Sequence, residues 1–102
     1  MLKLSDYMRY PGPRYKKLGP DSGEMLRDDI IWPLFAKDHD LVINLDVKGF
    51  GSSFLDEAFT GLVLNYGLKR SDIEFLLENL MCESDCTIVE EIREYINNVL
   101  SD

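Results

Sequence analysis

Residues 41–66 read LVINLDVKGFGSSFLDEAFTGLVLNY, and this stretch decides the fold of the chain. The segment Leu41–Val47 is mostly apolar and β-branched, which is typical of a central strand that is covered on both faces. From Leu55 to Tyr66 apolar residues recur every three or four positions, which predicts an amphipathic helix that stops at Gly67. The stretch therefore predicts a buried strand, a glycine-containing loop over residues 48–53 and a helix.

The first 17 residues combine a predicted hairpin with an excess of positive charge. Leu2–Tyr7 and Arg14–Leu18 flank a turn of two prolines and a glycine, and we expect them to pair as its two arms. These 17 residues carry five cations against Asp6 alone, a balance of +4. The whole chain carries −8, so the remaining 85 residues carry −12. This basic segment is expected either to lie near the protein's own acids or to receive an acidic partner or a phosphate.

A helix is predicted between this basic segment and the central strand. Asp21 or Ser22 is expected to be its N-cap, because either side chain can accept a hydrogen bond from a free amide of the first turn. The helix is expected to end by Lys37. Its apolar stripe would leave Arg27 on the outer face, and Pro33 is expected to kink or shorten it.

The C-terminal third predicts a further strand and a last helix. Asp72–Leu80 fits a short helix or a strand, and a strand is preferred because it would give the preceding helix a crossover role. Helical spacing of apolar residues predicts a final helix from about Asp85 to Leu100. The order β-β-α-β-α-β-α predicts one α/β domain over residues 1–102, a sandwich in which helices pack against a small mixed sheet of about four strands. Sites in such sheets lie beyond the C-terminal ends of central strands, where residues 48–53 are expected.

Two segments of the chain resemble a known family. They are GPRYKKLGPDSGEMLRDDIIWPLF and GFGSSFLDEAFTGLV. The bacterial STAS-like domain of unknown function has the same order of a Gly-Pro-Arg-Tyr turn, a Ser-Gly-Glu helix start and a Ser-Ser-Phe-Leu-Glu/Asp-Glu-Ala-Phe helix start. The resemblance runs from about Leu2 to Gly67, and more loosely to the end. It implies a STAS-like fold and a regulatory, signalling role in protein–protein interaction, with a histidine-kinase-type ATPase or another regulator as the partner.

The STAS-like family is similar in turn to the STAS domains of anti-sigma-factor antagonists, in which a partner kinase phosphorylates a serine in the loop after a strand. This similarity implies Ser52, with Ser53 beside it, as the phosphoacceptor here. Gly51 and Phe54 stand where that loop has aspartate and glycine. The residues themselves also allow both serines to be plain helix caps. The partner surface is expected to comprise the loop and the helix start, namely Phe50, Gly51, Phe54, Asp56 and Glu57.

The start of the first predicted helix is a second candidate site. A helix N-terminus with arginines nearby can bind a phosphate or a carboxylate, and the residues expected to do so are Arg14, Ser22, Gly23 and Arg27. The alternative function is therefore a small anion- or nucleotide-binding module, or an enzyme that uses this basic hairpin and Glu24. In the other interpretation, Arg14 pairs with Glu24 or Asp21 and only stabilises the hairpin.

Several function classes are disfavoured by the sequence. The net charge of −8 argues against nucleic-acid binding. The chain contains no apolar run long enough to cross a membrane and no secretory signal, so we expect a cytoplasmic protein. Cys82, Cys86 and the single His39 are too few to form a zinc site, so we expect reduced thiols, no metal and no cofactor. No nucleotide-binding fingerprint or nucleophile elbow is present, and a non-enzymatic role is expected, with the oligomeric state open.

Overall fold

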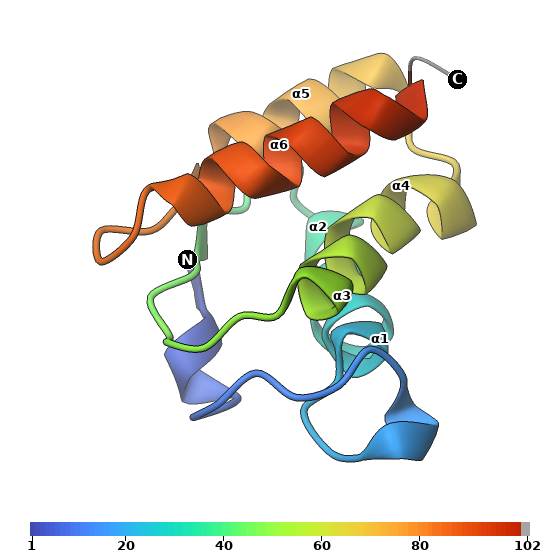
Figure 1. The fold of residues 1–102 in the computed structure, drawn as a ribbon. Coiled ribbons are helices and arrows are strands. Elements are labelled where there is room, and N and C mark those ends of the chain that lie inside the picture. The colour runs from blue at the N-terminus through green and yellow to red at the C-terminus, as the bar shows by residue number, and fades with distance from the viewer. Residues whose placement is uncertain (101–102) are drawn as a thin grey trace.

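The computed structural model, drawn in Figure 1, describes residues 1–100. It contains one parallel sheet. The sheet consists of β1 (Leu2–Lys3), β2 (Ile43–Asn44) and β3 (Leu80–Met81), in that spatial order. Leu2 pairs with Ile43, and Ile43 pairs with Leu80 on its other side. The predicted central strand is therefore confirmed, although its regular part is shorter than Leu41–Val47.

The predicted hairpin is wrong, and the described residues contain three parallel strands instead of about four mixed ones. After β1 the chain forms the 3-10 helix η1 (Leu4–Asp6), and the expected second arm leads into another, η2 (Lys16–Leu18). The segment between them bonds elsewhere. The carbonyl oxygens of Pro13 and Arg14 accept hydrogen bonds from the amides of Gly23 and Glu24, at 2.9 and 3.0 Å. These oxygens therefore bind free amides at the start of a helix, and they do not form the strand-pairing bonds of a hairpin.

Residues 23–35 form a continuous helical run, here called the first long helix. It consists of α1 (Gly23–Met25), the π-helical stretch η3 (Leu26–Ile31) and α2 (Trp32–Phe35). Ser22 is the N-cap, and its hydroxyl accepts a hydrogen bond from the amide of Met25 at 3.0 Å. Pro33 is the second residue after the π-helical stretch. Because proline has no amide hydrogen and its ring crowds the preceding turn, a wider turn at this place accommodates it within the helix.

Residues 52–66 form the second long helix, which has the same composite character. It consists of α3 (Ser52–Leu55), the π-helical stretch η4 (Asp56–Thr60) and α4 (Gly61–Tyr66). The helix stops at Gly67, whose left-handed φ of 59° is the conformation that glycine adopts most easily. The predicted helix and its stop are confirmed.

The preference for a strand over Asp72–Leu80 is wrong, because α5 (Arg70–Glu78) occupies most of that segment. Buried Ile73, Leu76 and Leu77 follow helical spacing. The carboxylate of Asp72 accepts a hydrogen bond from the Lys69 amide at 3.1 Å, which stabilises the first turn. The strand β3 is confined to Leu80 and Met81, which follow the helix after Asn79. The last helix, α6 (Thr87–Leu100), agrees with its prediction.

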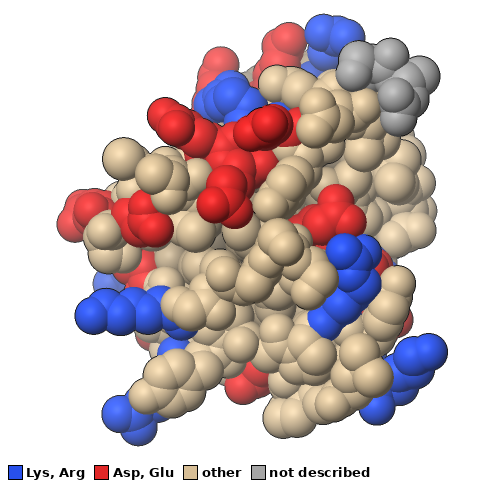
Figure 2. All heavy atoms as spheres, viewed as in Figure 1, with Lys and Arg blue, Asp and Glu red and all other residues tan. Residues whose placement is uncertain are grey.

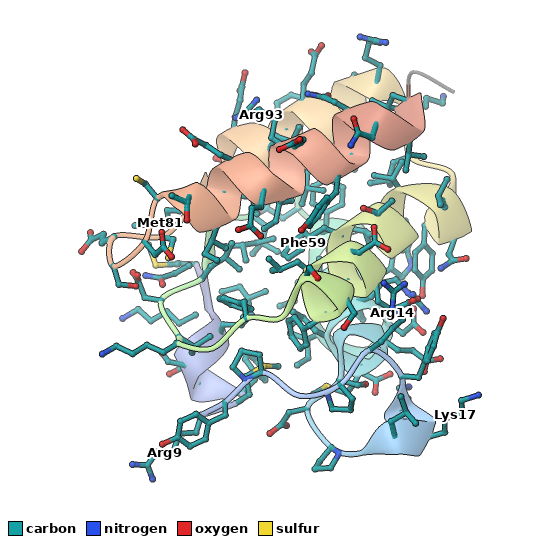
Figure 3. All side chains as sticks on the ribbon, in the orientation of Figure 1. Arg9, Arg14, Lys17, Phe59, Met81 and Arg93 are labelled. Carbon is teal, nitrogen blue, oxygen red and sulfur yellow. The ribbon has the colours of Figure 1, made fainter. Side chains whose placement is uncertain are left out.

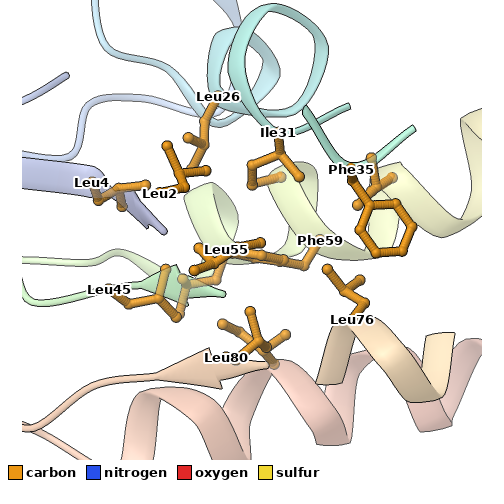
Figure 4. Packing of buried hydrophobic residues seen from close by; sticks show 14 of the residues in the cluster. Leu2, Leu4, Leu26, Ile31, Phe35, Leu45, Leu55, Phe59, Leu76 and Leu80 are labelled. Atoms are coloured by element: carbon orange, nitrogen blue, oxygen red, sulfur yellow. The ribbon is translucent and has the colours of Figure 1, made fainter. Parts of the chain in front are cut away.

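One hydrophobic core connects the sheet to the helices (Figure 4). Large, fully buried side chains come from strand ends, from both long helices, from α5 and from α6; examples are Leu4, Ile31, Phe35, Leu45, Phe54, Phe59, Leu76 and Ile92. The two long helices approach each other closely at Gly23, where a Cβ atom would lie 2.5 Å from the carbonyl oxygen of Phe54. None of the described helices is both long and apolar enough to cross a membrane.

Candidate functional site

The serine pair lies at the start of the second long helix, after the loop that leaves β2. Gly51 has the extended conformation of the N-cap, with φ −87° and ψ 151°, so Ser52 and Ser53 are the first two helical residues. Neither serine caps the helix, which makes that interpretation wrong. Both side chains are exposed and form no hydrogen bond within residues 1–100. Their hydroxyl groups are therefore accessible from solvent.

A cavity of about 350 Å³ lies next to this loop, beyond the C-terminal ends of β2 and β3. The loop residues Val47–Phe50 form one wall, and Ser84, Asp85 and Ile88 form the other. This location is the one predicted from the strand order. The cavity lies next to the loop that presents the serine pair.

Asp46 joins the two walls of this cavity, a role that the sequence interpretation missed. Its carboxylate accepts hydrogen bonds from the amide and the hydroxyl group of Ser84, both at 2.9 Å, and from the thiol of Cys82 at 3.4 Å. The hydrogen bond from the Ser84 amide is the largest of the causes that lower the pKa of Asp46 to about 2. Asp46 is thus charged at neutral pH and connects the β2 loop to the turn before α6.

The predicted partner surface divides into a buried part and an exposed part. Phe54 is fully buried in the core, so it supports the helix from inside and does not form the surface. Its ring lies 5.6 Å from the ring of Phe50, which is half-buried above it. Gly51 is exposed, and Asp56 and Glu57 are partly exposed. The accessible surface therefore consists of the loop, the two serines, and the side chains of Asp56 and Glu57 in the next turn.

The arginines and carboxylates that were predicted to form two separate sites lie in one cluster. Arg14 Nη1 lies 3.1 Å from Asp56 Oδ2 and 3.4 Å from Glu57 Oε1. Figure 3 shows Arg14 beside the second long helix. Arg27 binds the Glu57 carboxylate from the other side. We call these residues, together with Asp28, the arginine–carboxylate cluster.

Arg27 is buried, which corrects the prediction that it lies on the outer face of its helix. Its Nε lies 2.7 Å from Asp28 Oδ1, and this bond is the main cause that raises the pKa of Arg27. The same interaction, with a hydrogen bond of 2.7 Å donated by the hydroxyl group of Tyr66, lowers the pKa of Asp28. The Tyr66 ring stacks on Trp32 with centroids 4.3 Å apart. The cluster is thus charged, and it joins the two long helices.

The predicted anion site is closed in this arrangement. Arg14 and Arg27 are already paired with carboxylates, and the Ser22 hydroxyl caps its own helix. Gly23 is buried against Phe54. Glu24 accepts a hydrogen bond from the Lys16 amide at 2.9 Å and does not pair with Arg14. An added phosphate would have to displace an existing carboxylate from either arginine.

The basic segment is partly neutralised by the protein's own acids, as one of its two interpretations predicted. Besides the pairs of Arg14, Lys16 lies 3.1 Å from Asp29. Lys3, Arg9 and Lys17 form no ion pair with any residue in the range 1–100. In Figure 2 the Lys and Arg side chains lie mainly around the lower half of this face, whereas Asp and Glu gather in the upper left, where α6 begins.

Comparison with known proteins identifies one family. The family model described as a STAS-like domain of unknown function (DUF4325) matches residues 22–84, which include both long helices, β2, α5 and β3. No curated protein and no solved structure matches the chain. The matched residues contain the serine pair, Asp46 and most of the arginine–carboxylate cluster, whereas Arg14 lies outside them.

Proposed function

Because this chain belongs to the family of STAS-like domains of unknown function, we propose that it is a non-enzymatic regulatory module that binds another protein. The proposed surface is the loop after β2 together with the first turn of the second long helix. Phosphorylation of Ser52 is proposed to control the binding. The observation that carries this proposal is that Ser52 and Ser53 are exposed at a helix start and form no hydrogen bond within residues 1–100.

Phosphorylation would change the charge of this surface. A phosphoserine adds about −1.5 to −2 charges at neutral pH, and the first turn of a helix tolerates a negative charge. Asp56 lies four residues after Ser52, so a phosphate and this carboxylate are neighbours on the helix surface. The modified surface would therefore repel an acidic partner and would disfavour an apolar one. The proposed partner is a histidine-kinase-type ATPase or another regulator, as the resemblance to the STAS-like family implies.

The first experiment measures phosphorylation directly. The purified protein is incubated with ATP and a histidine-kinase-type ATPase of the same host, and its intact mass is measured. The wild type and the Ser53→Ala variant are expected to gain one phosphate, whereas Ser52→Ala gains none. A wild-type chain that gains no mass and does not bind the ATPase contradicts the proposal.

The second experiment distinguishes the effect of a negative charge at Ser52 from the effect of a negative charge added elsewhere on the surface. Calorimetry compares the binding of the ATPase to the wild type and to the Ser52→Asp variant, for which we expect roughly tenfold weaker binding, a loss of about 1.4 kcal/mol. Ser71→Asp is the matched control, because Ser71 is also an exposed serine in the first turn of a helix. Equal weakening in both variants would show that general charge, and not this surface, determines the binding.

A further inference from the structure

A second cavity, of about 230 Å³, lies along the outer side of the second long helix. Its walls include Arg14 from the basic segment and residues of the helix at three- and four-residue spacing: Asp56, Glu57, Thr60, Gly61 and Leu64. Residues at this spacing share one face of a helix. The cavity therefore runs from the second turn of the helix, at Asp56, toward its C-terminal end.

Thr60 lies in the wall of this cavity with an unsatisfied hydroxyl group. The residue is only 4% exposed, and its Oγ1 is the one buried side-chain polar atom among the described residues that has no hydrogen-bond partner. Buried polar groups are nearly always hydrogen-bonded, because burial without a partner is unfavourable. A ligand with a hydrogen-bond donor would satisfy this oxygen.

The arginine–carboxylate cluster next to Thr60 has one surplus negative charge. It contains the carboxylates of Asp28, Asp56 and Glu57 but only two guanidinium groups. Both oxygens of Glu57 contact an arginine. Arg27 contacts both oxygens of Asp28.

Asp56 is the one carboxylate of the cluster with an oxygen atom that no arginine contacts. It contacts Arg14 through Oδ2 alone, and its side chain is 40% exposed. The surplus charge therefore lies at Asp56, in the wall of the cavity. Leu64, which is 61% exposed, provides an apolar surface farther along the same helix.

We propose that this cavity binds a primary alkylammonium group, the group of a lysine side chain or of a free alkyl diamine. The ammonium donates hydrogen bonds to Asp56 and to Thr60 Oγ1, and its aliphatic stem packs on Leu64. A primary ammonium has three donors and no acceptor, and its single charge balances the cluster. A phosphate or a carboxylate would instead add to the surplus negative charge.

This inference goes beyond the proposed function, because it assigns a ligand to the face of the second long helix that contains Asp56 and does not require the partner of the serine loop to supply that ligand. Its test requires neither the partner nor phosphorylation. Binding of a small ammonium can fail while Ser52 phosphorylation is observed, and the reverse result is equally possible. The two proposals are therefore distinguishable.

The experiment is a titration followed by the amide resonances of the ¹⁵N-labelled protein. The probes are 1,4-diaminobutane and N-acetyl-lysine methylamide, with tetramethylammonium as a probe that has the charge but no donor. We expect saturable shifts at the amides of Gly61 and Leu64 with the two primary amines and none with tetramethylammonium. Tighter binding of the lysine derivative identifies a protein side chain as the source, and tighter binding of the diamine identifies a free amine.

Three variants test whether Asp56 and Thr60 bind the ammonium group. Asp56→Asn and Thr60→Val are each expected to weaken binding about tenfold, since each removes a hydrogen bond to a charged group. Glu90→Gln is the matched control, because it removes the same charge from an exposed position on α6, and its affinity is expected to equal that of the wild type. The proposal is overturned if Glu90→Gln weakens binding as much as Asp56→Asn, if the shifts do not saturate, or if tetramethylammonium produces the same shifts.

Discussion

Arg27 is bound to Glu57 twice, since its guanidinium donates to the main-chain carbonyl oxygen of Glu57 at 3.2 Å and to the carboxylate of the same residue. The Arg27 side chain is 7% exposed and that of Glu57 is 14% exposed. This pair connects the first long helix to the second in a region from which water is largely excluded.

Replacement of Arg27 by methionine is expected to lower the free energy of unfolding by about 3 kcal/mol, because it removes the buried cation that pairs with the half-buried carboxylates of Asp28 and Glu57. Urea denaturation followed by the fluorescence of Trp32, the single tryptophan, measures this change. Arg70→Met is the control, since Arg70 is exposed at the start of α5, and its effect is expected to stay below about 0.5 kcal/mol. Similar losses in both variants would contradict the structural importance of the Arg27–Glu57 pair.

Gly23→Ala is expected to destabilise the fold by roughly 1–3 kcal/mol. The added Cβ would lie 2.5 Å from the Phe54 carbonyl oxygen, so the two long helices would have to move apart. Gly51→Ser is the comparison, since no atom lies within 4 Å of a Cβ there and the N-cap position favours serine. This second variant is expected to gain a few tenths of a kcal/mol. A stability of Gly23→Ala equal to that of the wild type would disprove the close helix contact.

Thr60→Val is expected to raise the free energy of unfolding by about 1 kcal/mol, because it replaces an unpaired buried hydroxyl group with a methyl group of similar size. Thermal and urea unfolding of the unliganded protein measure the change. A clear loss of stability would indicate that the hydroxyl group forms a hydrogen bond in solution. The sign of the change therefore tests the premise of the ammonium site separately from any ligand.

Asp46 is expected to make stability depend on acid pH. Its pKa in the folded state is about 2, whereas an aspartate in an unfolded chain has a pKa of about 3.9. Because the folded pKa is the lower one, the charged carboxylate stabilises the fold above about pH 4, and this contribution is lost as the pH falls through about 2. The stability difference between the wild type and Asp46→Asn should therefore shrink from pH 4 to pH 2. A difference that stays constant over this range would rule out the bonds of Asp46 to Ser84 as its origin.

The central elements of the fold were predictable because their signals are local. The β-branched run before Lys48 and the apolar spacing that ends at Gly67 each specify one structure. Asp72–Leu80 was misassigned because its spacing fits both a helix and a strand. The decisive feature there is the bond between the Asp72 carboxylate and the Lys69 amide, which selects the helix.

The hairpin and the exposure of Arg27 were predicted wrongly for a different reason. The carbonyl oxygens of Pro13 and Arg14 bond to amides about ten residues away, and no turn motif specifies that pairing. Arg27 lies beside the apolar stripe of its own helix, and it is buried because Glu57 on another helix pairs with it. Such tertiary contacts override the pattern of a single element.

The position of the loop and of the serine pair in the fold was predicted correctly, but the contacts around them were not. The serine pair and the loop lie at the predicted end of the central strand. The roles of Asp46 and Thr60 had no local signal, since each depends on neighbours from distant parts of the chain or on a cavity that only the packed helices form.

The parallel pairing of the sheet has a consequence for the order of folding. Leu2 pairs with Ile43, and Ile43 pairs with Leu80, so the two ladders join residues 41 and 37 positions apart. Closing such long loops costs chain entropy before any strand bond can form, whereas the helices need only local contacts. We therefore expect the helices to form early and the strand pairing to limit the folding rate, even though the strands contain few of the residues.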